Sequence, residues 1–271
     1  MTAHLTERTV EGVRVTSRPV TDEEVAHFHE KGWVVLRQLI SPELAGAMLE
    51  RIKARMGEDG LSYKDRPGFD WSSDAGTTYR GVSHDEPLFA DFVQDEDMGR
   101  SMARLVGRRV GMRLLDDSML VRTTERSQPQ SYHQDRPSGW DRDHVAPWIA
   151  LAEIPPQMGT MRFFSGSHAA GLFGKIGGDE EVIRRTIPAM RDAELSEQPH
   201  LMPGDATVHH HLTIHGSSAN SMPLPRWAYR IRYLPEDSRY TNMPSEMVKR
   251  LDFAPYQTFD HPNFPLTRYV P

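Results

Sequence analysis

Two segments of the chain carry residues that could bind a metal: Gln130–Asp141 (QSYHQDRPSGWD) and His209–Asn220 (HHHLTIHGSSAN). In the first, His133 and Asp135 are separated by one residue, so both side chains project to the same side of an extended segment and can reach one ion. A histidine from a distant strand would complete a set of two histidines and one carboxylate, which binds non-haem Fe(II) and leaves coordination positions open. A histidine and an aspartate at this spacing also occur in ordinary turns, so the pair alone does not establish a metal site.

The composition narrows the chemistry that is available. The 271 residues include no cysteine, which excludes disulfides, thiolate ligands and a cysteine nucleophile, and leaves nitrogen and oxygen donors for any metal. The net charge of -6 and the scattered arginines argue against a nucleic-acid partner, because phosphate binding needs clustered basic residues. No apolar run approaches the roughly 18 residues of a membrane span. We therefore expect a cytoplasmic protein with no membrane partner.

The first third of the chain reads as helix, strand and helix. Thr21 is a candidate N-cap with Glu24 at the capping-box position, and Gly32 is placed to end that helix. Residues 33–40 have the β-branched character of a strand, and a second helix is expected to begin at Pro42.

The sequence pattern changes after the second predicted helix. Residues 58–82 show no steady period and are predicted to form a long loop, and residues 88–107 are predicted to form one helix. From residue 109 onward, short apolar or alternating runs are broken by proline and glycine, which favours a sandwich or barrel over alternating strands and helices. These predicted strands lie within residues 110–123, 146–154, 159–166, 205–216 and 226–235.

The last of these runs has two chemically different faces, because side chains alternate along a strand. One face carries Trp227, Tyr229, Ile231 and Tyr233, and the other carries Arg226, Ala228, Arg230 and Arg232. We predict that the aromatic face packs on helices and that the arginine face lines a polar interior.

The domain organisation is expected to be simple. The length suits one domain spanning residues 1–271, because barrels with appended helices commonly reach this size. Residues 1–20 are polar and aperiodic and are predicted to form an N-terminal arm. Residues 172–200 are polar with helical pieces and are predicted to be an insertion between core strands.

The histidine-rich segment carries a family resemblance. It reads MPGDATVHHHLTIHGSSANSMPLPRWAYRIRY, and Arg226 lies eleven residues beyond His215. With VTDEEVAHFHEKGWVVLRQLISPE, YHQD, PWIALAEI and FFSGSH, this segment resembles the phytanoyl-CoA dioxygenase family of Fe(II)/2-oxoglutarate-dependent oxygenases over most of the chain. Gly159 is retained from the pattern before FFSGSH, while the triple histidine at 209–211 is a departure from it.

The resemblance implies a fold and a metal centre. The fold would be mainly β with appended helices: a double-stranded β-helix, or cupin-like jelly-roll barrel, with helices packed on one face. The iron ligands would be His133, Asp135 and His215. Halogenases of this kind replace the carboxylate with a small residue, so the aspartate at 135 disfavours halogenation.

The resemblance also implies a co-substrate site. Arg226 would hold the far carboxylate of 2-oxoglutarate and Ser217 would assist it, while Gln130 and Trp148 would line the same site. A planar guanidinium grips a carboxylate through two parallel hydrogen bonds, which agrees with the role given to Arg226.

Several polar residues near this site can be interpreted in two ways. His209, His211 and His215 have the same parity on an unbroken strand, so alternation alone does not choose the distal ligand. We favour His215 because Gly216 and Ser217 follow it, and we expect His209 and His211 to line the polar interior and contact the iron ligands or the substrate. Four arginines flank the proposed iron loop and are interpreted as solvated charge, although they could contact an anionic substrate; these are Arg122, Arg126, Arg136 and Arg142.

The functional expectation is an enzyme that uses Fe(II), 2-oxoglutarate and O2. It would oxidise a small-molecule substrate by hydroxylation, ring closure, epimerisation or desaturation, and we prefer a role in natural-product biosynthesis. The first alternative is a cupin-like metal-dependent hydrolase or isomerase, against which Arg226 argues because a hydrolase has no use for a 2-oxoglutarate anchor. The second is a non-catalytic barrel that binds a small molecule.

Overall fold

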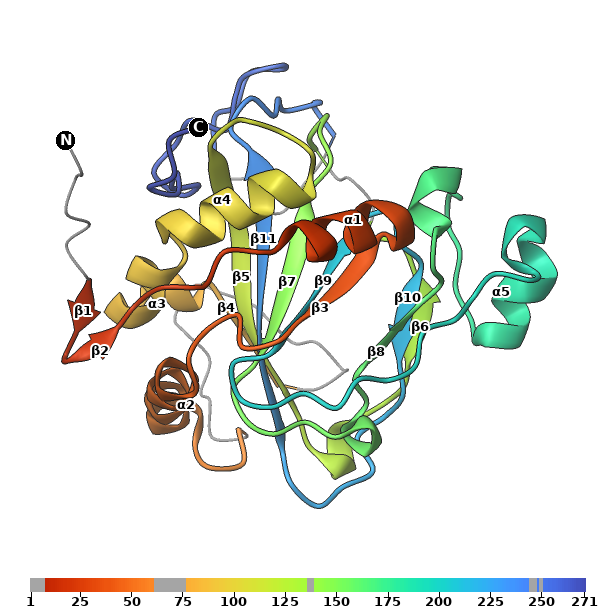
Figure 1. The fold of residues 1–271 in the computed structure, drawn as a ribbon, viewed down its shortest axis with the longest axis horizontal. Helices are drawn as coiled ribbons and strands as arrows, with labels where there is room; N and C mark the ends of the chain where they lie inside the picture. The colour runs from red at the N-terminus through yellow and green to blue at the C-terminus, as the bar shows by residue number, and fades with distance from the viewer. Residues whose placement is uncertain (1–7, 61–76, 136–138, 244–247, 249–250) are drawn as a thin grey trace.

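Two antiparallel sheets and a layer of helices make up the computed structural model, which describes residues 8–60, 77–135, 139–243, 248 and 251–271 (Figure 1). The helices are α1 (Asp22–Lys31), α2 (Pro42–Met56), α3 (Pro87–Phe92), α4 (Glu96–Leu105) and α5 (Glu180–Thr186). The strands are β1 (Thr9–Val10), β2 (Val13–Arg14), β3 (Trp33–Leu36), β4 (Thr77–Arg80), β5 (Met112–Arg122), β6 (Gln130–His133), β7 (Val145–Ala150), β8 (Met161–Phe163), β9 (Ala206–His210), β10 (His215–Ser217) and β11 (Arg226–Pro235).

The strand order is that of a jelly roll. Six strands form the large sheet in the order β3-β9-β7-β11-β5-β4, and three form the small sheet in the order β6-β10-β8. Helices α1 and α4 cross in front of the large sheet, α3 lies to its left, and the small sheet lies to its right, beyond β9 and β3 (Figure 1). The prediction of a mainly β, cupin-like fold with appended helices is confirmed.

The two faces of β11 separate as their alternation predicts. Trp227, Tyr229, Ile231 and Tyr233 are buried in the same core as Phe28, Met48, Phe89 and Met102 of the helices. Arg226, on the opposite face, is buried within the interior between the sheets, where it meets Trp148 of β7. Burial of the aromatic face against helices leaves the arginine face to line the site.

The predicted helix ends are confirmed. The Thr21 hydroxyl accepts a hydrogen bond from the Glu24 N–H, and the Glu24 carboxylate accepts one from the Thr21 N–H, which completes the capping box. Gly32 ends α1 with φ of 79°, in the left-handed region that glycine adopts without strain. Helix α2 begins at Pro42, as expected.

The structure differs from the sequence prediction in two places after α2. Residues 58–82 are not one loop: β4 (Thr77–Arg80) pairs with β5 at the edge of the large sheet, while residues 61–76 lie outside the described part. The single helix predicted over 88–107 is two helices, because Asp95 acts as an N-cap between them and accepts from the Met98 N–H. A capping aspartate within a helical pattern was the overlooked signal.

The N-terminal segment also differs from the arm that was expected. Residues 1–7 lie outside the described part, but β1 and β2 form a short hairpin. Val15 and Val20 are buried, and the Ser17 N–H and hydroxyl both donate to Asp95. So few buried apolar residues produce no periodic pattern in the sequence, which is why the segment was predicted to be an arm.

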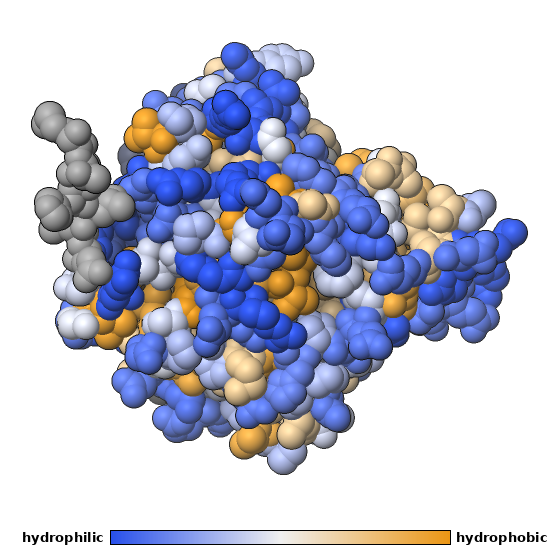
Figure 2. All heavy atoms as spheres, in the orientation of Figure 1, coloured by the Kyte–Doolittle hydropathy of each residue, from blue (hydrophilic) through white to orange (hydrophobic). Residues whose placement is uncertain are grey.

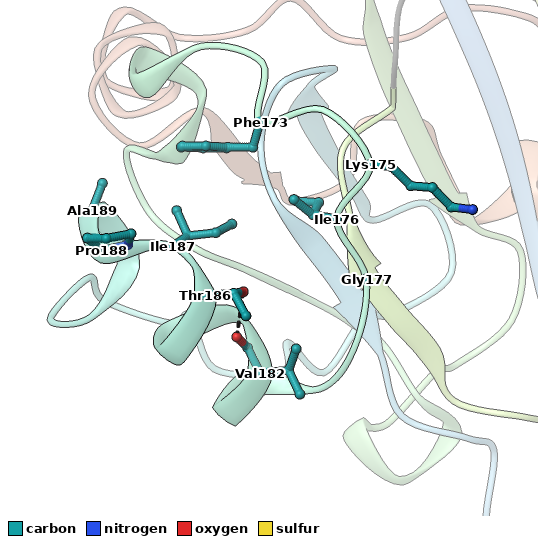
Figure 3. A pocket seen from close by; sticks show the side chains of 9 residues that line it. All are labelled: Phe173, Lys175, Ile176, Gly177, Val182, Thr186, Ile187, Pro188 and Ala189. Carbon is teal, nitrogen blue, oxygen red and sulfur yellow. Dashed lines mark hydrogen bonds between the residues drawn. The ribbon is translucent and has the colours of Figure 1, made fainter.

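Residues 172–200 contain α5 and a short 3-10 helix, Pro188–Met190. They line an open surface pocket of about 610 Å³, with Phe173, Ile176 and Ile187 among its walls (Figure 3). None of the predicted site residues lines this pocket. The face of the molecule in Figure 2 is mostly hydrophilic, with apolar residues in small groups. In the part of the chain that the structure describes, no helix is long and apolar enough to cross a membrane.

The capping box at α1 predicts the cost of removing it. Thr21→Ala should lower the free energy of unfolding by about 1 kcal/mol, because the Glu24 N–H loses its side-chain acceptor. Chemical denaturation of the two proteins measures this difference. An unchanged midpoint would show that solvent satisfies the helix end equally well.

Candidate metal centre

Strand register brings two of the predicted ligands together. In the small sheet, β6 and β10 are antiparallel and His133 pairs with His215, so their ring centroids lie 4.3 Å apart. Asp135 follows directly after β6. One ligand atom from each of the three residues lies within 4.8 Å of the other two, so His133, Asp135 and His215 could hold one ion.

Backbone contacts fix which imidazole nitrogens face that ion. The Nδ1 atom of His133 lies 2.9 Å from the Ser131 carbonyl oxygen, and Nδ1 of His215 lies 2.9 Å from the Thr213 carbonyl oxygen. A carbonyl only accepts, so each Nδ1 carries the proton and each Nε2 keeps its lone pair. Metal-binding histidines are commonly oriented in this way. Two such nitrogens and one carboxylate suit Fe(II).

Electrostatics in the centre favour an ionised Asp135 carboxylate beside a neutral His215 ring, whereas at His133 burial is outweighed by the contact with Asp135, which raises the pKa of that ring. Burial alone would raise the pKa of Asp135, but contacts with His133 and His209 hold it well below its usual value. Burial, together with the neighbouring His209 and His133, holds the pKa of His215 well below its usual value. A divalent cation needs both groups deprotonated, which is the state that these surroundings favour.

His209 contacts the carboxylate from β9. Its Nε2 atom lies 3.3 Å from Asp135 Oδ2, while His133 Nε2 lies 3.6 Å from Asp135 Oδ1. His209 is 3% exposed, and its ring lies 4.2 Å from that of His215. The contact leaves Oδ1 on the side of His133, where the predicted ion would bind.

His211 reaches the same residue through the backbone. Its Nδ1 atom lies 3.3 Å from the Asp135 carbonyl oxygen, and its Nε2 lies 2.7 Å from Asp143 Oδ1. His211 does not belong to the group formed by His133, Asp135 and His215. His209 and His211 were expected to line the interior and to contact the iron ligands or the substrate, and both contact Asp135.

Arg226 is a buried cation at the start of β11. It is 3% exposed, it donates to the Gly159 carbonyl oxygen at 2.5 Å, and its guanidinium carbon lies 5.1 Å from the Trp148 ring centroid. Its Nε is buried and has no acceptor in the part of the chain that the structure describes. Burial, with a contribution from Arg122, lowers the pKa of Arg226 to about 9. Such a cation is costly to bury until an anion joins it.

Arg122 adds a second positive charge at this end of the interior. It pairs with Arg226 across β5 and β11, and it lies within reach of Ser217 Oγ (3.4 Å) and Gln130 Oε1 (3.5 Å). Arg122 was interpreted as solvated charge, but it is partly buried beside the predicted co-substrate residues. The signal that could have found it is its position on the strand face that faces inward.

The chemistry of this end of the interior follows from its charges. Among the described residues, no carboxylate forms an ion pair with Arg226 or Arg122. Ser217 and Gln130 pair with each other across β10 and β6 and add neutral polar groups. Two arginines and polar neighbours, close to a candidate metal centre, form a site that fits a small dicarboxylate such as 2-oxoglutarate.

A family comparison agrees with this geometry. The family model described as phytanoyl-CoA dioxygenase matches residues 28–228, which is most of the chain. No curated protein shows significant sequence similarity to it.

Several solved structures have the same fold as this chain, although their sequences are only distantly similar to it. The non-haem α-ketoglutarate-dependent carbocyclase SnoK from nogalamycin biosynthesis is 20% identical with a TM-score of 0.73, covering 92% of this chain and 96% of its own. The epimerase SnoN, in complex with Fe3+, α-ketoglutarate and nogalamycin RO, is 21% identical with a TM-score of 0.71, covering 90% and 97%. EctD from S. alaskensis with bound Fe is 17% identical with a TM-score of 0.68, covering 89% and 88%.

The contact between Arg226 and Gly159 generates a test of local geometry. Gly159 has φ of 77°, and a Cβ there would lie 2.2 Å from the Ser218 carbonyl oxygen. Gly159→Ala should therefore destabilise the fold by more than the roughly 1–2 kcal/mol of a left-handed alanine.

Gly166→Ala is the matched control, because Gly166 also has a left-handed backbone with φ of 77°, and the nearest atom to an added Cβ there is the Glu30 carbonyl oxygen at 4.0 Å. Thermal or chemical denaturation compares the two variants. Equal losses of stability would mean that the Ser218 backbone yields without cost and does not constrain the Gly159 carbonyl.

Proposed function

The chain belongs to the phytanoyl-CoA dioxygenase family of Fe(II)/2-oxoglutarate-dependent oxygenases, and from this premise we propose that it oxidises a small molecule in natural-product biosynthesis. The observation that carries the proposal is a buried Arg226 that has no carboxylate partner among the described residues. It pairs across the sheet with Arg122, and the Gln130 amide contacts both Arg122 and His133, which belongs to the group of two histidines and an aspartate. The iron and 2-oxoglutarate, when bound, supply the oxidising power with O2, and 2-oxoglutarate becomes succinate and CO2.

We propose His133, Asp135 and His215 as the iron ligands. The proposal is supported by their mutual distances and by the two Nδ1 contacts that direct each Nε2 atom toward a shared point. His209 would orient the Asp135 carboxylate through Oδ2, a contact of the kind that tunes metal ligands in other proteins.

For 2-oxoglutarate, we propose that Arg226 holds the far carboxylate and that Ser217 and Gln130 complete the pocket. Trp148 would cover one side of the Arg226 guanidinium and exclude water. Arg122 joins this set, because it contacts Ser217 and lies opposite Arg226 in the sheet. Burial strengthens the attraction between these cations and a dicarboxylate.

The interior beyond this pocket supports a polar substrate. Arg232 holds Asp116 through two hydrogen bonds of 2.6 and 2.7 Å, and Arg230 contacts Asp116 and Ser118. All four side chains lie on the inward face of β5 and β11. A small molecule bound there would meet hydrogen-bonding groups rather than a hydrocarbon wall, which restricts its orientation.

The reaction is proposed to begin at a carbon–hydrogen bond of that small molecule. Two similar structures are described as a carbocyclase and an epimerase, which supports ring closure or epimerisation beside hydroxylation and desaturation as outcomes for this chain. The product mass separates these outcomes: hydroxylation adds one oxygen, ring closure or desaturation removes two hydrogens, and epimerisation leaves the mass unchanged.

The experiment that tests the function is a metabolite screen. Purified protein with Fe(II), 2-oxoglutarate and O2 is incubated with a library of natural-product intermediates, and substrate-stimulated succinate is measured. We expect stimulation by a polar small molecule and none after chelation of the metal. Full turnover of a substrate without metal or 2-oxoglutarate would contradict the proposal.

The Arg226 anchor predicts a loss of co-substrate affinity. Arg226→Met should weaken 2-oxoglutarate binding by a few kcal/mol, since hydrogen bonds to charged groups contribute about 1.5–3 kcal/mol each. Arg226→Lys keeps the charge but lacks the planar guanidinium that makes two parallel hydrogen bonds to a carboxylate, so it should recover only part of the affinity. Calorimetry on the anaerobic, metal-loaded protein measures both. Unchanged affinity in the methionine variant would place the anchor elsewhere.

The choice of distal ligand predicts a difference between two histidines. His215→Ala should abolish tight Fe(II) binding, whereas His211→Ala should weaken it by no more than about 10–100-fold, as is typical for residues that orient a ligand. Anaerobic Fe(II) titration of each variant gives the comparison. If His211→Ala loses iron and His215→Ala retains it, the assignment of His215 is wrong.

A further inference from the structure

A second group of possible metal ligands lies outside the proposed iron ligands. Asp143, His210 and His211, here called the second cluster, each offer one ligand atom within 4.8 Å of the others. The two histidines are mostly buried, with side chains 13% and 4% exposed, while the Asp143 side chain is 61% exposed. The cluster is therefore anchored by the protein and open to solvent on one side.

The convergence of two consecutive histidines on one carboxylate needs a specific backbone path. Neighbouring residues of a strand point to opposite faces, so His210 and His211 would diverge if β9 continued. The strand instead ends at His210, and the chain turns with a hydrogen bond from the Thr213 N–H to the His210 carbonyl oxygen at 2.8 Å. The rings stack at 4.7 Å, with Nε2 of His210 and His211 at 3.5 and 2.7 Å from Asp143.

The contacts of His211 orient its Nε2 atom toward Asp143. Its Nδ1 faces the Asp135 carbonyl oxygen, which only accepts, so Nδ1 carries a proton. Its Nε2 lies 2.7 Å from a carboxylate oxygen of Asp143, the distance of a hydrogen bond. A divalent cation that replaces the proton of this hydrogen bond would be held by both atoms. A histidine that donates one ring N–H to a backbone carbonyl is also a common arrangement among metal ligands.

We propose that the second cluster binds a divalent cation of the Zn2+ class, distinct from the iron centre. Two imidazoles and one carboxylate are ligands that Zn2+ takes, and the exposed side of Asp143 leaves a fourth position for water. Because His211 also contacts the Asp135 backbone, an ion on the second cluster fixes the turn that carries the iron-binding carboxylate.

The three ligands are not equivalent. The His210 Nδ1 atom accepts from the Leu212 N–H at 3.1 Å, so in the unloaded chain the proton of this ring sits on Nε2. Binding through His210 Nε2 moves that proton to Nδ1 and ends the contact with Leu212. His210 is therefore the weakest ligand of the three, and Asp143 and His211 contribute most of the affinity.

The test is a Zn2+ titration of the tag-free, metal-free full-length protein against a chromophoric chelator. The chain has no cysteine, so no thiolate competes for Zn2+. We expect two ions per chain with dissociation constants of micromolar or tighter. Asp143→Asn should bind one ion, His133→Ala should also bind one, and His210→Asn should retain two with the second weakened. Asp192→Asn, which removes an exposed carboxylate elsewhere, should retain two.

Two results would overturn the second cluster as a cation site. One is binding of a single tight ion by the wild-type protein, lost in His133→Ala. The other is two tight ions in Asp143→Asn. Both results leave the proposed iron centre untouched, and thermal unfolding of each variant separates loss of a site from loss of the fold.

Discussion

The buried guanidinium of Arg226 is the constraint on which the interior of this protein depends. Its environment offers carbonyl oxygens and the Trp148 ring, and Arg122 lies opposite it in the sheet, so burial lowers its pKa to about 9. A fold tolerates such a charge when a ligand completes its contacts. Gly159 allows this placement, because its left-handed backbone turns its carbonyl toward the guanidinium while its missing Cβ avoids Ser218.

The proposed iron centre is assembled on the small sheet and held from the large one. The pairing of His133 with His215 sets the distance between two ligands, and Asp135 follows on the same chain segment. His209 of β9 then contacts the Asp135 carboxylate, and His211, which follows β9, contacts the Asp135 backbone. A strand of the large sheet thus orients a residue of the small sheet, so metal binding and the packing of the two sheets are linked.

Much of the fold was predictable because it rests on local patterns. The capping box at Thr21, the glycine at 32 and the two faces of β11 follow from short-range geometry, and all three are confirmed. The division of residues 88–107 was missed although the capping Asp95 marks it locally, whereas the strand at Thr77–Arg80 was missed because it depends on β5, a partner far along the chain.

Local sequence patterns also predicted only part of the candidate site. Spacing paired His133 with Asp135, the family resemblance added His215 to the group, and the structure brings the ligand atoms of all three together. Arg122 was interpreted as a solvated charge because its sequence neighbours do not indicate that β11 places Arg226 opposite it in the sheet. The contacts of His209 and His211 with Asp135 depend on how the two sheets face each other, which the sequence of either strand alone does not reveal.

The most direct test of the account compares two ligands that differ only at the far carboxylate. Thermal unfolding of the anaerobic, Fe(II)-loaded protein is followed with 2-oxoglutarate and with 2-oxobutyrate, which keeps the α-keto acid but lacks that carboxylate. If Arg226 binds the far carboxylate, 2-oxoglutarate should raise the melting temperature and 2-oxobutyrate should raise it far less. The reason is that a ligand stabilises the folded state only to the extent that it binds to it. Equal stabilisation by both ligands would contradict the account.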